Sequence, residues 1–215
     1  MEEYYRQRAE EFEDVYYRAD PARRAEIKII IQAAKEALRG RRVLEIACGT
    51  GYWTQFVSHT ASEITATDSV VEVLNVARRK IYHCPVALQL ENAYTLSFGA
   101  ETFDGGLANF WFSHIPKNRI GGFIEGFHRV LQPGANVFLA DNVLVPDAGG
   151  EIISKAGDDN TYRLRTLRDG SEHIVLKNYH SAEDLIAIFG RHTDSFGASD
   201  VFIGEHFWYV TYRLP

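Results

Sequence analysis

The chain has 215 residues, a net charge of −6 and 46% hydrophobic residues, which predicts a globular protein with a substantial buried core. No stretch approaches the roughly 18 consecutive apolar residues of a membrane-spanning helix, and the acidic first residues lack the basic-then-apolar order of a secretory signal. We therefore expect a cytoplasmic protein without a membrane partner. Because the basic residues are scattered in an acidic chain, we also expect no nucleic-acid partner.

Two helices are predicted at the N-terminus. Apolar residues recur every three or four positions over residues 4–18, which predicts an amphipathic helix. Those apolar positions are Tyr5, Ala9, Phe12 and Tyr16. A second helix is predicted over residues 22–38, with Pro21 suited to its start and Gly40 to its end.

Five short and nearly continuous apolar runs follow, separated by helical stretches. The runs cover residues 42–47, 63–67, 86–90, 103–108 and 135–140. The predicted helices between them cover residues 53–59, 70–82 and 118–131. Buried strands that alternate with helices are typical of a parallel sheet covered on both faces, so the pattern predicts an α/β fold.

The last third of the chain interrupts this alternation. Residues 145–160 contain several glycines and predict an irregular or partly helical insertion. Asp169-Gly170-Ser171 predicts a hairpin turn between residues 162–168 and 173–179, because glycine accepts a positive φ. The remaining predicted elements are a helix at 181–189, capped by Ser181, and strands at 201–203 and 207–213.

The most informative segment is the strand ending Glu45-Ile46 and the small-residue turn Ala47-Cys48-Gly49-Thr50-Gly51. Such a turn lets a ligand approach the backbone closely. The GxGxxG dinucleotide fingerprint is incomplete whether it is aligned from Ala47 or from Gly49, because Tyr52 or Thr54 then occupies the third glycine position. The Gly-Lys-Ser/Thr end of a phosphate loop is also absent. The acidic strand end and this turn instead suit a ligand with a cationic amine.

Two polar residues follow the next predicted strands. Asp68 stands 17 residues after Gly51, where a carboxylate can accept hydrogen bonds from both hydroxyls of a ribose; a role at the start of the next helix is compatible with this. Asn92 offers a donor and an acceptor to an adenine edge, or serves as a plain turn residue. Because ligands of open α/β sheets bind beyond the carboxyl ends of the strands, we expect these residues to converge.

The sequence resembles the class I S-adenosylmethionine-dependent methyltransferases. The resemblance is carried by residues 43–51, Asp68 and residues 131–134. A closer resemblance, to the small bacterial enzymes that methylate small molecules, is carried by residues 110–116 and 167–170. It implies a Rossmann-like, doubly wound, mostly parallel seven-stranded sheet with the order 3-2-1-4-5-7-6 and an antiparallel seventh strand. An N-terminal helical lid and an inserted hairpin complete the expected fold.

We expect one domain over residues 1–215. Its expected parts are N-terminal helices (1–38), a cofactor-binding core (41–142), a variable insertion with a hairpin (143–180) and a closing helix with two strands (181–215). The resemblance is specific over residues 41–142 and weak from residue 143 onward.

The resemblance implies that the cofactor is S-adenosyl-L-methionine. The residues expected to bind it are Tyr5, Arg8, Glu45, Ala47, Cys48, Gly49, Gly51, Asp68, Ser69, Asn92, Ala93 and Asn109. Glu45 is expected to act through the turn on the methionine end, Asp68 on the ribose, and Asn92 with Ala93 on the adenine. Ala47 stands where the family usually has a glycine, and Asn92 where aspartate is common.

Methyl transfer requires alignment of the nucleophile, carbon and sulfur, and the exclusion of water. Aromatic walls suit this task, and the candidates are Tyr4, Tyr5, Trp111 and Phe112. His114 follows the fourth strand and is the candidate catalytic base and substrate contact, or alternatively an orienting histidine. Trp111 either lines the substrate site or packs in the core.

The first helix is a candidate lid. It places Tyr5, Arg8 and Phe12 on one face, so Arg8 can pair with the cofactor carboxylate, although a purely structural helix is equally compatible. Cys48 and Cys84 form no CxxC pair and the remaining histidines lack ligand spacing, so no disulfide and no metal is expected.

The sequence therefore predicts an S-adenosylmethionine-dependent methyltransferase acting on an oxygen or nitrogen of a small molecule. Two alternatives stay open: a catalytically silent S-adenosylmethionine-binding module, and a methyltransferase acting on tRNA or protein. A nicotinamide oxidoreductase ranks last, because the dinucleotide fingerprint is incomplete.

Overall fold

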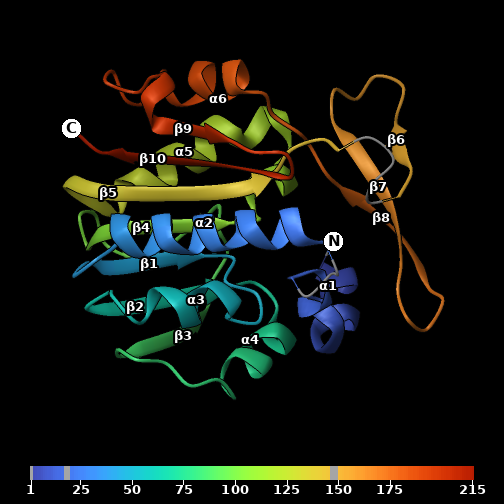
Figure 1. The fold of residues 1–215 in the computed structure, drawn as a ribbon, viewed down its shortest axis with the longest axis horizontal. Helices are drawn as coiled ribbons and strands as arrows, with labels where there is room; N and C mark the ends of the chain where they lie inside the picture. The colour runs from blue at the N-terminus through green and yellow to red at the C-terminus, as the bar shows by residue number, and fades with distance from the viewer. Residues whose placement is uncertain (1, 17–19, 146–149) are drawn as a thin grey trace.

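The computed structural model describes residues 2–16, 20–145 and 150–215 (Figure 1). A seven-stranded sheet has the order β3-β2-β1-β4-β5-β10-β9. Its strands are β1 (Arg42–Ile46), β2 (Glu63–Asp68), β3 (Val86–Leu90), β4 (Phe103–Asn109), β5 (Leu131–Asn142), β9 (Val201–Ile203) and β10 (Phe207–Arg213). Strands β1 to β5 pair in parallel, and β10 is antiparallel to both neighbours. The predicted order and the antiparallel seventh strand are confirmed.

Helices cover both faces of this sheet (Figure 1). One face carries α2 (Pro21–Ala37), α3 (Tyr52–Val57) and α4 (Val71–Ala77), and the other carries α5 (Ile120–Arg129) and α6 (Ala182–Phe189). None of the helices in the described part of the chain is long and apolar enough to cross a membrane.

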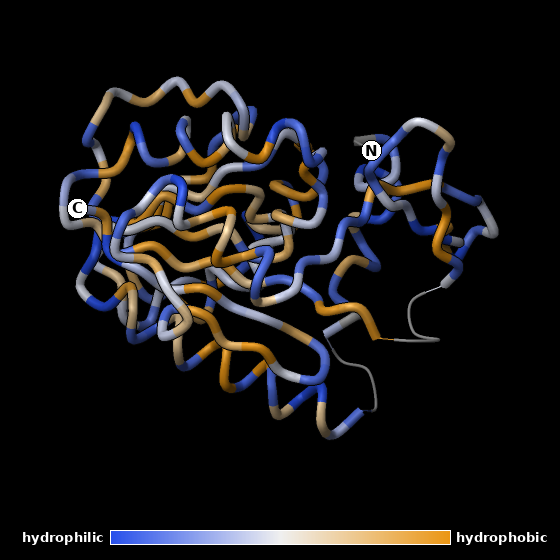
Figure 2. The backbone as a smooth tube through the Cα atoms, turned by 90° about the horizontal axis from the view of Figure 1, so that it is seen from above, coloured by the Kyte–Doolittle hydropathy of each residue, from blue (hydrophilic) through white to orange (hydrophobic). Residues whose placement is uncertain are grey.

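Strand β5 shows how the two faces are built. Val137 and Leu139 pack in the core cluster that includes α5 and α6, whereas Phe138 and Ala140 pack in the cluster that includes α2 and α3. Successive side chains of a strand point to opposite faces, so a strand with helices on both sides is apolar throughout. Figure 2 shows the hydrophobic segments running through the larger body of the molecule.

Two helix starts follow from their capping residues. The Asp20 carboxylate accepts a hydrogen bond from the Arg23 N–H at 3.0 Å, and Pro21 occupies the first turn of α2. Ser181 and Asp184 form a reciprocal capping box at α6, which confirms Ser181 as the N-cap.

The N-terminal segment differs from the single predicted helix. It forms α1 (Glu2–Arg8) and then a 3₁₀ helix, η1 (Ala9–Tyr16), while residues 17–18 of the prediction lie outside the described residues. A 3₁₀ helix aligns residues three apart. Glu13 accepts a hydrogen bond from Thr50, and Tyr16 stacks on Tyr52 with ring centroids 3.9 Å apart. These tertiary contacts favour the tighter helix.

A second, three-stranded antiparallel sheet follows β5. It consists of β6 (Ile152–Ser154), β7 (Thr161–Thr166) and β8 (Glu172–Leu176). The hairpin turn predicted at residues 169–171 is confirmed. Strand β6 lies in the segment predicted to be irregular or partly helical, and it was missed because three residues are too few to show a periodic pattern. This sheet and α1 stand at the same end of the main sheet (Figure 1).

Several predicted boundaries shift. Strand β5 begins at Leu131, so the turn predicted at residues 132–134 lies inside the strand. The strand is irregular there, since Gly134 has a φ of 76° and the pairing of β4 with β5 shifts register between Phe103 and Gly105. The predicted helix at 70–82 ends at Ala77. Short 3₁₀ helices are η2 (Phe112–His114), η3 (Lys117–Arg119) and η4 (Ala198–Asp200).

Candidate active site

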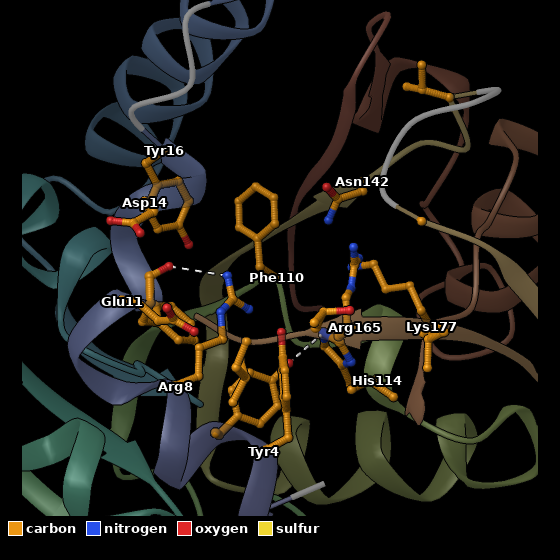
Figure 3. Close-up of a pocket in the computed structure, with 18 of the residues that line it drawn as sticks. Tyr4, Arg8, Glu11, Asp14, Tyr16, Phe110, His114, Asn142, Arg165 and Lys177 are labelled. Atoms are coloured by element: carbon orange, nitrogen blue, oxygen red, sulfur yellow. Dashed lines mark hydrogen bonds between the residues drawn. The ribbon is translucent and has the colours of Figure 1, made fainter. Parts of the chain in front are cut away.

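Two cavities lie at the carboxyl ends of the central strands. The strand-end cavity, of about 310 Å³, is lined by residues that follow β1, β2, β3 and β4. The hairpin cavity, of about 700 Å³, lies between the N-terminal helices, the end of β5 and the strands β7 and β8 (Figure 3). The two cavities share the wall residues Tyr5, Phe12, Tyr16, Phe110 and His114.

Most of the residues predicted to bind a cofactor line the strand-end cavity. They are Tyr5, Ala47, Cys48, Gly49, Asp68, Ser69, Asn92, Ala93 and Asn109, together with Trp111 and His114. Three predicted residues do not line it. Arg8 lines the hairpin cavity instead, Glu45 lies beneath the turn, and Gly51 ends the turn at the N-cap of α3.

The turn after β1 depends on left-handed backbone at alternate positions. Ala47, Gly49 and Gly51 have φ values of 52°, 56° and 77°. A Cβ atom on Gly49 would lie 3.2 Å from the Phe12 ring, so the glycine also lets η1 pack against the turn. At Ala47 the same conformation costs about 1–2 kcal/mol, because the Cβ crowds the following carbonyl.

The Asp68 carboxylate connects the turn to the start of α4. Oδ2 accepts a hydrogen bond from the Gly49 N–H, and Oδ1 accepts one from the Val70 N–H, both at 2.9 Å. The N-cap of α4 is Val70 rather than Asp68, so the predicted capping role is wrong, and Asp68 instead accepts from the N–H of the cap residue. Asp68 also lines the strand-end cavity, and a carboxylate has further acceptor positions, so its contact with a ribose stays a prediction.

Glu45 lies beneath the turn rather than in the cavity. The residue is buried, and its Oε2 accepts a hydrogen bond from Thr54 Oγ1 at 2.7 Å. Burial, which disfavours the carboxylate, and the nearby charge of Asp68 together raise the pKa of Glu45 to about 8. Glu45 is therefore placed to hold the turn on α3.

His114 and Tyr5 meet where the two cavities join. His114 Nδ1 lies 2.7 Å from the Leu176 carbonyl oxygen, which can only accept, so Nδ1 carries the proton. Nε2 is then the acceptor for the Tyr5 O–H at 3.0 Å. Burial and the nearby charge of Lys177 together lower the pKa of His114 to about 3, so the imidazole is neutral at physiological pH.

A buried ion pair behind His114 was not predicted from the sequence. Lys177 Nζ donates to Asp141 Oδ1 at 3.0 Å and to Ser113 Oγ at 2.6 Å, and Asp141 Oδ2 accepts from the Ser113 N–H at 2.8 Å. Burial opposes the charge on Asp141, but Lys177 holds the pKa of that carboxyl well below its usual range. The pair joins β5, η2 and the residue after β8, and so fixes the backbone on which His114 stands.

Two polar side chains in the strand-end cavity have different surroundings. Asn109, which ends β4, is buried, and neither polar atom of its amide has a hydrogen-bond partner among the described residues. An unpaired buried amide is costly, so this position suits a bound polar ligand. Asn92 Oδ1 instead accepts a hydrogen bond from the Tyr94 N–H at 2.9 Å, which is the turn role.

Trp111 lines the cavity and also packs against the core. Its ring centroid lies 5.8 Å from that of Tyr94 and 6.4 Å from that of Phe123. Arg119 lies over the Tyr94 ring, with its guanidinium carbon 3.6 Å from the ring centre. The two sequence interpretations of Trp111 are therefore compatible with each other.

Comparisons with known proteins agree with this geometry. Residues 43–134 match the methyltransferase domain family. The chain is 26% identical over 164 residues to a ubiquinone biosynthesis O-methyltransferase of Xanthomonas campestris pv. campestris, a match covering 75% of this chain and 65% of the relative. A mitochondrial protein of the same name from Rattus norvegicus is 28% identical over 110 residues, covering 47% of this chain and 31% of that protein. The chain thus spans less than two thirds of these relatives.

Solved structures share the fold over nearly the whole chain. The DhpI-SAM-HEP complex superposes with a TM-score of 0.78 at 24% identity, covering 99% of this chain and 95% of that one. The PH0226 protein from Pyrococcus horikoshii OT3 gives a TM-score of 0.67 at 14% identity, covering 92% and 93%. The similarity therefore includes the N-terminal helices and the inserted sheet as well as the central strands.

Proposed function

Because the chain belongs to the class I S-adenosylmethionine-dependent methyltransferases, we propose that it transfers a methyl group to an oxygen or nitrogen of a small molecule. The observation that carries this proposal is the pair of adjoining cavities. One lies at the strand ends where the family resemblance places the cofactor, and the other is closed by the N-terminal helices and the inserted sheet.

The strand-end cavity fits S-adenosyl-L-methionine. Its volume of about 310 Å³ is sufficient for a small ligand. The turn exposes backbone at Ala47 and Gly49, the Asp68 carboxylate suits a ribose, and the unpaired amide of Asn109 suits a polar group of the ligand. When bound, this cofactor supplies an electrophilic methyl group on a positively charged sulfur.

The shared wall residues suit the exclusion of water. Tyr5, Phe12, Tyr16 and Phe110 present aromatic rings at the junction, and aromatic faces attract a cation. Phe110 holds a φ of 58°, an uncommon conformation for a bulky side chain that directs its ring between Trp53 and Phe207. Three of these rings, those of Tyr5, Phe12 and Tyr16, come from α1 and η1, which supports a lid role for the N-terminal helices.

His114 is the proposed catalytic base. Nε2 lies at the junction and already accepts a hydrogen bond from the Tyr5 O–H, so an acceptor hydroxyl that takes the place of Tyr5 would donate to the same nitrogen. The hydroxyl must lose its proton when its oxygen is methylated, and the neutral imidazole is placed to take up that proton. The pKa of about 3 makes His114 a weak base, so proton transfer follows rather than precedes bond formation.

The acceptor is proposed to be a small molecule. A cavity of about 700 Å³ encloses a compact acceptor, and the O-methyltransferase names of the curated relatives favour an oxygen nucleophile. The test is incubation of the purified protein with S-adenosyl-L-methionine and a panel of hydroxylated aromatics, hydroxy acids and amines, followed by mass spectrometry.

We expect S-adenosylhomocysteine and one methylated member of the panel to accumulate together. Parallel reactions with total tRNA and with protein extract identify a macromolecular acceptor. Cofactor binding without turnover on any of these acceptors would instead support the silent binding module.

A further inference from the structure

The hairpin cavity is rich in cations although the whole chain is acidic. Among the described residues, its lining includes five cations but two carboxylates, Glu11 and Asp14; the cations are Arg8, Arg23, Arg165, Arg168 and Lys177. The chain as a whole carries a net charge of −6. A cavity of opposite charge to its protein indicates a ligand that the chain attracts by electrostatics.

The two carboxylates of the lining are already paired. Arg168 Nε lies 3.2 Å from Glu11 Oε2, and the same guanidinium pairs with Asp14. Lys177 is neutralised by the buried Asp141. Glu11, Asp14 and Asp141 are therefore each paired with Arg168 or Lys177.

Arg8 and Arg165 hold the central positions. Arg8 extends from α1, with its guanidinium 5.1 Å from the centre of the Phe12 ring and 5.5 Å from that of Tyr4. Arg165 stands on β7, so the two guanidinium groups enter from the two elements that close the cavity (Figure 3). No ion pair joins Arg8 to a carboxylate among the described residues.

The environment of Arg165 contains further positive charge. Burial lowers the pKa of Arg165, and the charges of Arg8 and Arg163 lower it further. Tyr4 and Tyr179, whose phenol groups can donate hydrogen bonds, also line this cavity. Like charges brought together in a half-buried site repel, and an anion between them would relieve that repulsion.

We propose that the acceptor carries a compact oxyanion, a carboxylate or a phosphate-type group, that is bound between Arg8 and Arg165. This inference rests on the proposed function, since it names the chemical class of the molecule in the acceptor cavity. A guanidinium presents two parallel N–H donors that match the oxygens of such a group. Bound in this way, the oxyanion would also join α1 to the inserted sheet and so hold the lid closed.

The test compares three probes of similar size: phenyl phosphate, benzoate and the neutral benzyl alcohol. Each is titrated by calorimetry at constant ionic strength into the wild-type chain, with and without saturating S-adenosylhomocysteine. Arg165→Gln and Arg8→Gln remove one guanidinium each, and Arg165→Lys keeps the charge. The control is Arg39→Gln, which removes an exposed arginine paired with Glu36.

We expect at least one anion to bind about tenfold or more tightly than benzyl alcohol to the wild type and to Arg39→Gln. This preference should disappear in Arg165→Gln and Arg8→Gln and be intermediate in Arg165→Lys. Stronger binding of phenyl phosphate assigns a phosphate-type group, and stronger binding of benzoate assigns a carboxylate. Circular dichroism should show that the variants remain folded.

Equal affinity for the anions and the alcohol in the wild type would overturn the inference, as would a preference that survives both glutamine variants. If Arg8→Gln weakens S-adenosylhomocysteine and leaves the anion preference intact, Arg8 serves the cofactor and the pairing with Arg165 is wrong. Failure of S-adenosylhomocysteine to bind at all contradicts the proposed function instead, and the titrations without it still measure the anion preference.

Discussion

The Tyr5 O–H donates a hydrogen bond to His114 Nε2 across 109 positions of sequence, at a distance of 3.0 Å. This contact connects the N-terminal helix to the segment that follows β4, at the junction of the two cavities. Both groups are neutral over the physiological range, since burial raises the pKa of Tyr5 and lowers that of His114. The contact therefore needs no ionisation to form.

Tyr5→Phe tests whether this contact holds the lid closed until an acceptor hydroxyl takes the place of Tyr5 at His114. The ring would still pack against Tyr4, at a centroid distance of 5.0 Å, but the donor to His114 would be lost. We expect the free energy of unfolding to fall by about 1 kcal/mol and turnover to fall more than cofactor affinity. The matched control is Tyr209→Phe, whose ring stacks on Phe202 outside both cavities. Equal turnover in the two variants would show that the contact has no part in closure.

His114→Ala should lower turnover by at most about 10²-fold, the low end for a general base, because His114 is a weak base that takes the proton after bond formation; S-adenosylhomocysteine affinity should stay within a few-fold of wild type. Because burial places the pKa of His114 near 3, the pH–rate profile of the wild type should show no His114 ionisation between pH 5 and 8. His59→Ala, at an exposed histidine outside both cavities, is the control. Turnover unaffected by His114→Ala at every pH would mean that the residue is not a base.

Glu45 should make stability depend on pH. Its folded-state pKa of about 8 lies above the ordinary value of 4.5, so the folded chain binds a proton more tightly than the unfolded chain does. The resulting stability is complete below about pH 4.5 and is lost as pH rises toward 8.

Glu45→Gln should remove this loss, and the difference in unfolding free energy between pH 5 and pH 8 should change by roughly 2 kcal/mol or more. Denaturant titrations of both proteins measure it, with the exposed Glu36→Gln as control. If the unfolding free energy changes with pH equally in wild type and Glu45→Gln, the raised pKa of Glu45 is wrong.

Ala47→Gly tests the strain in the turn. At an ordinary helical position such as Ala33 in α2, replacement of alanine by glycine costs about 0.5–1 kcal/mol. At Ala47 the φ of 52° favours glycine, and relief of about 1–2 kcal/mol should offset the entropic cost. We expect Ala47→Gly to be neutral or stabilising in denaturant unfolding. A loss as large as that of Ala33→Gly would show that the turn is unstrained.

Local pattern was enough to predict most of the fold and most of the residues that line the strand-end cavity. Burial on both faces leaves β1 and β2 nearly continuous apolar runs, and the small residues between Ala47 and Gly51 mark the turn. Asp68 was identified because it ends a strand next to that turn, and strand ends converge. The exception is Glu45, whose strand position was predicted correctly but whose side chain contacts Thr54 beneath the turn.

Contacts between segments that are distant in the sequence could not be predicted, because they leave no local pattern in it. Lys177 and Asp141 are separated by 36 positions, and neither is periodic with its neighbours. The Glu26 carboxylate accepts hydrogen bonds from the N–H groups of Glu205, His206 and Phe207, about 180 positions away, and so holds α2 on the turn between β9 and β10. Only the folded arrangement reveals such partners.

Calorimetric titration of S-adenosylhomocysteine into the wild type, Asp68→Ala and Asp104→Ala tests the proposed cofactor site directly. Asp104 pairs with Arg41 at the amino end of β4, away from both cavities. We expect saturable binding to the wild type and to Asp104→Ala, and binding at least tenfold weaker to Asp68→Ala, a loss of about 1.5–3 kcal/mol. Absence of saturable heat in the wild type, or undiminished affinity in Asp68→Ala, would show that the strand-end cavity does not bind the cofactor as proposed.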